Sequence, residues 1–147
     1  MIIGFSGHRH IDANKLNCIT ASIKNILISL KPKKAISGMA LGLDTIAAEI
    51  CIELKIPFIA AVPFLGQEVL WSKEDKEKYR DLLDQAEDVV IVSPGAYSAW
   101  KLHKRNEYIV DNSDQMLVYY DGRSGGGTKS FINYCTKKNK PIEYVKC

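Results

Sequence analysis

The sequence of 147 residues has no long hydrophobic run and only a small excess of charge of one sign. No apolar segment approaches the roughly 18–20 residues that a membrane helix needs, and Met1–Phe5 has the pattern of a strand and not that of a signal peptide. We therefore expect a cytoplasmic protein with no membrane partner. The net charge of +3 does not require a nucleic-acid partner, and we expect none.

Cysteine is scarce as well, with four residues and no C-x-x-C pair. Neither a zinc ribbon nor a thioredoxin-type redox pair is therefore indicated. The cysteines are Cys18, Cys51, Cys135 and Cys147, and three of them fall in expected helices or beside apolar positions. A reduced cysteine packs there as a small hydrophobic side chain, so we expect free thiols, in keeping with a cytoplasmic location.

The overall composition is typical of a globular domain, with 46% hydrophobic and 25% charged residues. The length is within the roughly 100–200 residues of a single core, and no linker divides the chain. We expect residues 1–147 to form one domain.

Short apolar runs alternate with segments of helical period along the whole chain. This pattern predicts an α/β fold with a mostly parallel sheet of about six strands, covered by helices on both faces. Asp12 is a candidate cap for the first helix, and Ser72 with Asp75 resembles a capping box that opens a helix over 73–85. The expected strands are Ile2–Phe5, Lys34–Ser37, Phe58–Val62, Asp88–Val92, Gln115–Tyr120 and Ile142–Val145.

Three glycine-containing segments follow expected strands: Ser6–Arg9, Ser37–Gly42 and Gly122–Thr128. In an open parallel sheet such segments meet at the edge where ligands bind. Glycine permits close approach of a ligand, and a helix amino terminus attracts phosphate, so the pattern favours a nucleotide or a diphosphate. The segments match neither the phosphate loop of ATPases nor the dinucleotide fingerprint of dehydrogenases.

In this order, the motifs resemble the YspA/YpsA-like branch of the SLOG superfamily. The resemblance rests on Ser6–Arg9, Ser37–Asp44, Pro63-Phe64 with Trp71-Ser72, Arg105-Asn106 with Val110-Asp111 and Ser113-Asp114, and the loop from Asp121-Gly122 to Gly127-Thr128. It implies a Rossmann-like three-layer sandwich whose pocket takes a nucleotide-derived molecule, often beside a homodimer interface. It also implies a higher homo-oligomer as an alternative to the dimer.

The loop pattern and the resemblance together give a set of candidate ligand-binding residues. They are Gly7, His8, Arg9, Gly38, Met39, Ala40, Gly42, Asp44, Phe64, Trp71, Arg105, Asn106, Asp121, Gly122, Gly125, Gly126, Gly127 and Thr128. We expect no cofactor and no metal, because two histidines and an aspartate as close in sequence as His8, His10 and Asp12 rarely all face one ion.

Four of these candidates also have plain structural interpretations. Asp44 can hydrogen-bond a ribose or cap a helix. Arg105 can pair with a phosphate or lie on a solvated helix face, although the resemblance favours the former. Phe64 and Trp71 can sandwich a base or plug the core under a loop.

Binding is favoured over catalysis by one departure from the family pattern. The resemblance implies a loop glutamate in the phosphoribohydrolases of the superfamily, and that position is Phe131 here. Our leading hypothesis is therefore a protein that senses or sequesters a nucleotide-derived signal, such as an ADP-ribose or cyclic-nucleotide type, in a setting such as host–virus immune signalling. The alternative is an N-glycosidase or phosphoribohydrolase that uses Asp44 or Glu107. Single-stranded DNA binding is a weaker alternative.

Overall fold

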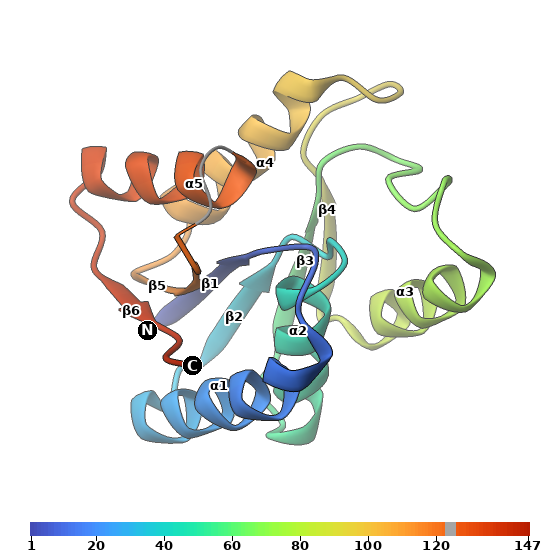
Figure 1. Ribbon diagram of the computed structural model, residues 1–147. Coiled ribbons are helices and arrows are strands. Elements are labelled where there is room, and N and C mark those ends of the chain that lie inside the picture. The colour runs from blue at the N-terminus through green and yellow to red at the C-terminus, as the bar shows by residue number, and fades with distance from the viewer. Residues whose placement is uncertain (123–125) are drawn as a thin grey trace.

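The computed structural model describes residues 1–122 and 126–147, which form a sheet with helices on both faces (Figure 1). The described strands are β1 (Ile2–Gly7), β2 (Lys34–Ser37), β3 (Phe58–Val62), β4 (Asp88–Ile91), β5 (Gln115–Tyr119) and β6 (Ile142–Tyr144). The helices are a 3₁₀ turn, η1 (Ala13–Lys15), followed by α1 (Leu16–Leu30), α2 (Leu43–Glu53), α3 (Lys73–Gln85), α4 (Ala99–Asp111) and α5 (Gly126–Lys137).

The sheet has the strand order β4-β3-β2-β1-β5-β6, and every pairing within the described residues is parallel. The chain moves outward from β1 to β4 on one side and then returns to place β5 on the other side of β1. The order therefore reverses between β1 and β5, which is where a ligand crevice opens in folds of this kind.

Two apolar clusters fill the space between the sheet and its helices. One contains Phe5 and Phe58 with the inward faces of α1, α2 and α3. The other contains Met116 and Val118 with α4 and α5, which lie on the opposite side in Figure 1. Right-handed crossovers explain this division, because the direction of chain progression changes after β4. The expected Rossmann-like three-layer α/β sandwich is confirmed, with a sheet that is fully parallel in the described part of the chain.

Local sequence signals set several element boundaries correctly. The strand over 58–62 and the helix over 73–85 have the expected bounds, and Ser72 Oγ accepts a hydrogen bond from the backbone N–H of Asp75 at 3.1 Å. The expected cap at Asp12 is wrong in its chemistry. Asp12 precedes the turn η1, and its side chain makes no capping hydrogen bond there.

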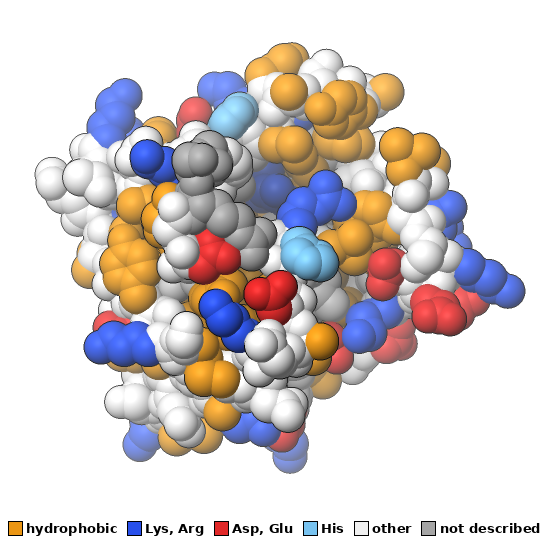
Figure 2. Space-filling view, in the orientation of Figure 1, with side chains coloured by type: hydrophobic (Ala, Val, Ile, Leu, Met, Phe, Trp, Pro, Cys, Tyr) orange, Lys and Arg blue, Asp and Glu red, His pale blue; other side chains and the backbone are white. Residues whose placement is uncertain are grey.

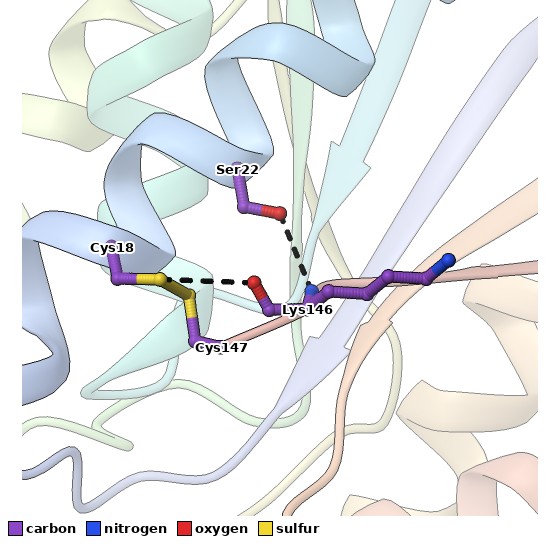
Figure 3. The surroundings of a disulfide bond; sticks show 4 residues. All are labelled: Cys18, Ser22, Lys146 and Cys147. Carbon is purple, nitrogen blue, oxygen red and sulfur yellow. Dashed lines mark hydrogen bonds between the residues drawn. A yellow bond between two sulfur atoms is a disulfide. The ribbon is translucent and has the colours of Figure 1, made fainter.

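The expectation of free thiols is wrong for two of the four cysteines. Cys18, near the start of α1, forms a disulfide with Cys147 after β6 (Figure 3). The chain returns to α1 because the backbone N–H of Val145 donates to Val118 O and that of Lys146 donates to Ser22 Oγ. Cys51 and Cys135 are free and buried, as expected.

None of the described helices is both long enough and apolar enough to cross a membrane.

Candidate functional site

A cavity of about 1100 Å³ lies at the carboxyl edge of the sheet. Its walls come from the end of β1, the start of α2, the segment after β3, the segment before α4 with the middle of α4, and the first turn of α5. Figure 2 shows a recess on this face with apolar side chains above it and to its right. Twelve of the sequence-predicted site residues line the cavity: Gly7, His8, Arg9, Ala40, Asp44, Phe64, Trp71, Arg105, Asn106, Gly126, Gly127 and Thr128.

Asp44 and Arg105 form a buried charged cluster at the base of this cavity. Each is only 7% exposed. The Arg105 guanidinium donates from Nη1 to Gly38 O at 2.5 Å and from Nε to Asn106 Oδ1 at 3.0 Å. The interpretation of Arg105 as part of a solvated helix face is therefore wrong.

The two oxygens of the Asp44 carboxylate are in different situations. Oδ2 accepts a hydrogen bond from the backbone N–H of Ala40 at 3.3 Å, whereas Oδ1 is buried and has no hydrogen-bond partner among the described residues. Burial raises the pKa of Asp44 to about 6, and the positive charges of Arg105 and Arg9 and the Ala40 N–H moderate that rise. An unpaired buried acceptor is costly, so a hydroxyl donor that entered the cavity would be stabilised here.

The loop over 38–42 is held by the protein's own groups. Met39 N donates to Ser37 Oγ at 3.2 Å, and Thr45 Oγ1 donates to Ala40 O at 2.8 Å. Gln67 Nε2 lies 3.3 Å from both Gly38 O and Met39 O, beside the Arg105 contact. Because its polar groups are used in this way and Asp44 adds negative charge, this loop is poorly suited to a phosphate.

The end of this loop and the first residue of α2 lie against the segment that follows β1. Gly42 has a φ of +81°, which L side chains rarely adopt, and the carbonyl oxygen of His8 accepts a hydrogen bond from Leu43 N at 3.1 Å. A side chain at Gly42 would collide with the backbone at His8 and Arg9. The glycine is needed for close approach of protein backbone to protein backbone.

The amino end of α5 is open in comparison. A Cβ added at Gly126 or Gly127 would meet no described atom within 4 Å, and both residues are exposed and line the cavity. The first N–H groups of a helix have no partner within the helix and carry a partial positive charge. Gly125, a further candidate, lies outside the described residues.

His8 joins the end of β1 to the start of the loop after β5. Its Nε2 lies 3.0 Å from Asp121 Oδ1 and 3.1 Å from the Asp121 backbone nitrogen. The imidazole also contacts the rings of Tyr119 and Tyr120, with centroids 5.6 Å away in both cases. Asp121 therefore contacts His8, which lines the cavity. Asp121 and Gly122 are not themselves among the described lining residues.

Aromatic and apolar side chains form the opposite wall. Phe64 is 6% exposed and makes an edge-to-face contact with Tyr97 at 5.7 Å between centroids. Tyr97 is 66% exposed, and Leu65 and Leu70, which line the same cavity, are exposed too. The Trp71 ring packs edge-to-face on Tyr79. A large apolar wall beside a few convergent polar groups is the usual composition of a small-molecule site.

Some candidates lie elsewhere within the described part of the chain. Gly38, Met39 and Gly42 support the cavity from behind and do not line it. Glu107 pairs with Lys104 at 3.6 Å, away from the cavity. Phe131 is fully buried in the cluster under α4 and α5, so the position that holds a glutamate in the hydrolases is part of the core here.

Sequence reasoning missed Tyr97 and Gln67, which both line the cavity. Tyr97 follows Pro94-Gly95 after a strand, and an aromatic residue at such a turn was the available signal. Gln67 gave no signal, because its role depends on the loop over 38–42, which lies far away in the sequence.

The comparison with known families settles the relationship. Residues 6–146 match the YspA SLOG family. The chain belongs to this family. The SPbeta prophage-derived protein YoqJ of Bacillus subtilis is 33% identical over 136 residues, which are 81% of this chain and 78% of YoqJ. A UPF0398 protein of Brevibacillus brevis is also 33% identical, over 74% of this chain, and this chain spans only 61% of that relative.

Solved structures share the fold. DNA processing protein A from Streptococcus pneumoniae superposes with a TM-score of 0.77 and 17% identity, over 97% of this chain and 49% of that chain. The Helicobacter pylori protein of the same name superposes with a TM-score of 0.75 and 18% identity, over 98% of this chain and 64% of that chain. The molybdenum cofactor carrier protein from Chlamydomonas reinhardtii superposes with a TM-score of 0.61 and 16% identity, over 97% of this chain and 74% of that chain.

These structures correct the expectation that nucleic acid is not a partner. The Helicobacter pylori protein was described for its single-stranded DNA binding mode, so the shared fold is compatible with nucleic-acid binding. The physical reason is that net charge is a poor guide, because nucleic-acid binding depends on where cations gather and not on their excess over the whole chain.

Proposed function

We propose that this protein captures a nucleotide-derived small molecule of the ADP-ribose type, and that sensing or sequestering it is the function. One observation carries the proposal: Asp44, whose buried Oδ1 lacks a hydrogen-bond partner among the described residues, and the open amino end of α5 line the same large cavity. A ligand with both hydroxyl groups and a phosphate matches this combination.

Each part of the ligand has a matching surface. A ribose hydroxyl would donate to Asp44 Oδ1, and a phosphate would accept from the N–H groups of the first turn of α5. The base would lie against Phe64 and Tyr97, since aromatic faces stack on any nucleobase. Arg9, an exposed side chain that lines the cavity, supplies positive charge for the anion.

Capture agrees with the comparisons in two respects. A carrier of molybdenum cofactor has this fold, so the fold is compatible with holding a small molecule. One relative is prophage-derived, which agrees with a role in signalling between a phage and its host.

Cleavage of an N-glycosidic bond is the second candidate, and one observation favours it. The pKa of Asp44 near 6 suits a general acid or base at neutral pH. The core position of Phe131 weighs against it, because no loop glutamate is available there.

The test is to incubate the protein with a mixture of AMP, ADP, ADP-ribose, NAD and a short single-stranded DNA, and to analyse the bound and free fractions by mass spectrometry. Capture predicts an intact nucleotide released when the protein is denatured. Asp44→Asn should lose this retention, and Glu107→Gln, whose side chain lies outside the cavity, should keep it. Free base in the solution would favour the hydrolase, DNA alone in the bound fraction would favour nucleic acid, and an empty protein would contradict all three.

A further inference from the structure

A second cavity, of about 680 Å³, lies between α1, α2 and α3. The proposed function makes no use of it. Asn17 and Thr20 of α1, Thr45 and Glu49 of α2 and Tyr79 of α3 all line it. It is therefore built from the start of α1, from one side of α2 along its length, and from α3 on the same face of the sheet.

The two cavities adjoin. Arg9, Leu41, Trp71 and Asp75 line both of them. Among residues 1–122 and 126–147, Arg9 is the one cationic side chain that does so. Its exposed guanidinium thus lies at the junction, where a group shared by the two cavities would pass.

The walls of the second cavity are suited to an uncharged, flat group. Two of its three carboxylates are paired with lysines: Glu49 lies 3.3 Å from Lys78, and Glu53 lies 2.8 Å from Lys24. The third, Asp75, lies at the junction with the main cavity and not among the walls deeper between the helices. Ile11, Ile46 and Trp71 supply apolar surface, while Asn17, Thr20 and Thr45 supply neutral donors and acceptors. Apolar contact with a few neutral hydrogen-bonding groups is how a heterocyclic base or a nucleoside is held.

Resting on the proposed function, we infer that the second cavity is a subsite for the second half of a two-part ligand. One nucleoside would occupy the main cavity against Asp44, and the other half would occupy the cavity between α1, α2 and α3. The anionic bridge between the halves would pass Arg9. A ligand of the ADP-ribose type thereby has a place for each of its two halves, and the same arrangement would accept dinucleotides and other nucleoside diphosphate sugars.

The subsite can be blocked without altering the main cavity. Thr20 is partly buried and lines only the second cavity, so Thr20→Trp would fill that cavity from α1. Ala21→Trp adds the same side chain at the next position, which is exposed and lines neither described cavity, and serves as the matched control. Asn17→Trp, at an exposed position on the rim of the second cavity, repeats the test if Thr20→Trp does not fold.

Calorimetric titration with AMP and with ADP-ribose tests whether the second cavity binds the second half of the ligand. We expect the wild-type protein to bind ADP-ribose at least about tenfold more tightly than AMP, and Thr20→Trp to abolish this difference while the affinity for AMP stays within about twofold. Ala21→Trp should leave both affinities as in the wild type. Equal affinities of the wild type for the two ligands, or an unchanged preference in both Thr20→Trp and Asn17→Trp, would overturn the subsite and leave the proposed function intact. Failure of the wild type to bind either nucleotide would overturn both.

Discussion

The loop over 38–42 and the first turn of α5 are both glycine-containing segments, and their surroundings are opposite. Both contain glycines, and both precede or begin a helix at the same edge of the sheet. At Gly38 an added Cβ would lie 2.7 Å from Arg105 Nη1 and 2.9 Å from Asp44 Oδ2. At Gly127 it would meet no described atom within 4 Å.

This difference shows what a glycine in a strand-to-helix loop can mean. In the first case the close approach is made by the protein's own charged side chains, and in the second the space is available to a ligand. The loop over 38–42 therefore contributes to the site by positioning Asp44 and Arg105, while we propose that the first turn of α5 contacts the phosphate.

The largest effect is expected from Arg105→Ala. This change removes the donor to Gly38 O and leaves the buried Asp44 carboxylate without its nearest compensating charge. The free energy of unfolding should fall by about 3–5 kcal/mol, the usual cost of an uncompensated buried charge. Denaturant unfolding measures it, with Lys104→Ala on the exposed face of the same helix as the control, where about 0–1 kcal/mol is expected. Similar losses in the two variants would mean that the loop does not depend on Arg105.

The pH dependence of stability should report on Asp44. Its pKa is raised from 3.8 to about 6 on folding, so the folded state holds the proton more tightly than the unfolded state. The contribution of Asp44 to stability is thus most favourable below pH 4 and is lost as the pH rises through 6. The free energy of unfolding of the wild type minus that of Asp44→Asn should fall by about 3 kcal/mol between pH 4 and pH 7. A difference that stays constant with pH would show that the Asp44 pKa is not raised.

A smaller loss is expected from Gly38→Ala. The added methyl group must displace either the Arg105 guanidinium or the Asp44 carboxylate. Overpacking of this kind costs about 1–3 kcal/mol. Thermal unfolding of Gly38→Ala beside Gly127→Ala makes the comparison directly, and equal melting temperatures for the two variants would contradict it.

The smallest effect on stability is expected at Gly127. Gly127→Ala should change the free energy of unfolding by no more than about 1 kcal/mol and can be stabilising, because alanine is favoured over glycine within a helix. Two further variants, Gly127→Asp and Gly127→Asn, carry side chains of the same size and are compared by their affinity for ADP-ribose. Gly127→Asp should weaken ADP-ribose binding about tenfold relative to Gly127→Asn, because a carboxylate at this end of the helix competes with a phosphate. The same affinity in both variants would place the phosphate elsewhere.

The sequence was sufficient for several elements with local signals, although the local cap signal at Asp12 was wrong. The buried run Phe58–Val62 and the capping residue Ser72 determined their elements, since each depends on a few adjacent residues. The pairing of Arg105 with Gly38 O joins residues 67 positions apart, and the disulfide joins residues 129 positions apart. Such contacts depend on how the layers pack, so the sequence could suggest Arg105 as a site residue without revealing its partner.

The two glycine segments show the same limit within the candidate site. Sequence alone predicts close approach at both segments, and it does not show whether a side chain or a ligand makes that approach. Asp44 illustrates this too. The sequence allows it to cap a helix or to bind a ribose, and only the structure shows that one oxygen accepts from a loop amide while the other lacks a partner among the described residues.

The most direct measurement is a crystal structure of the protein grown with ADP-ribose. The account predicts a phosphate on the backbone N–H groups of Gly127 and Thr128, and a ribose hydroxyl on Asp44 Oδ1. A phosphate bound instead by the loop over 38–42, or a ligand that makes no contact with Asp44, would contradict it.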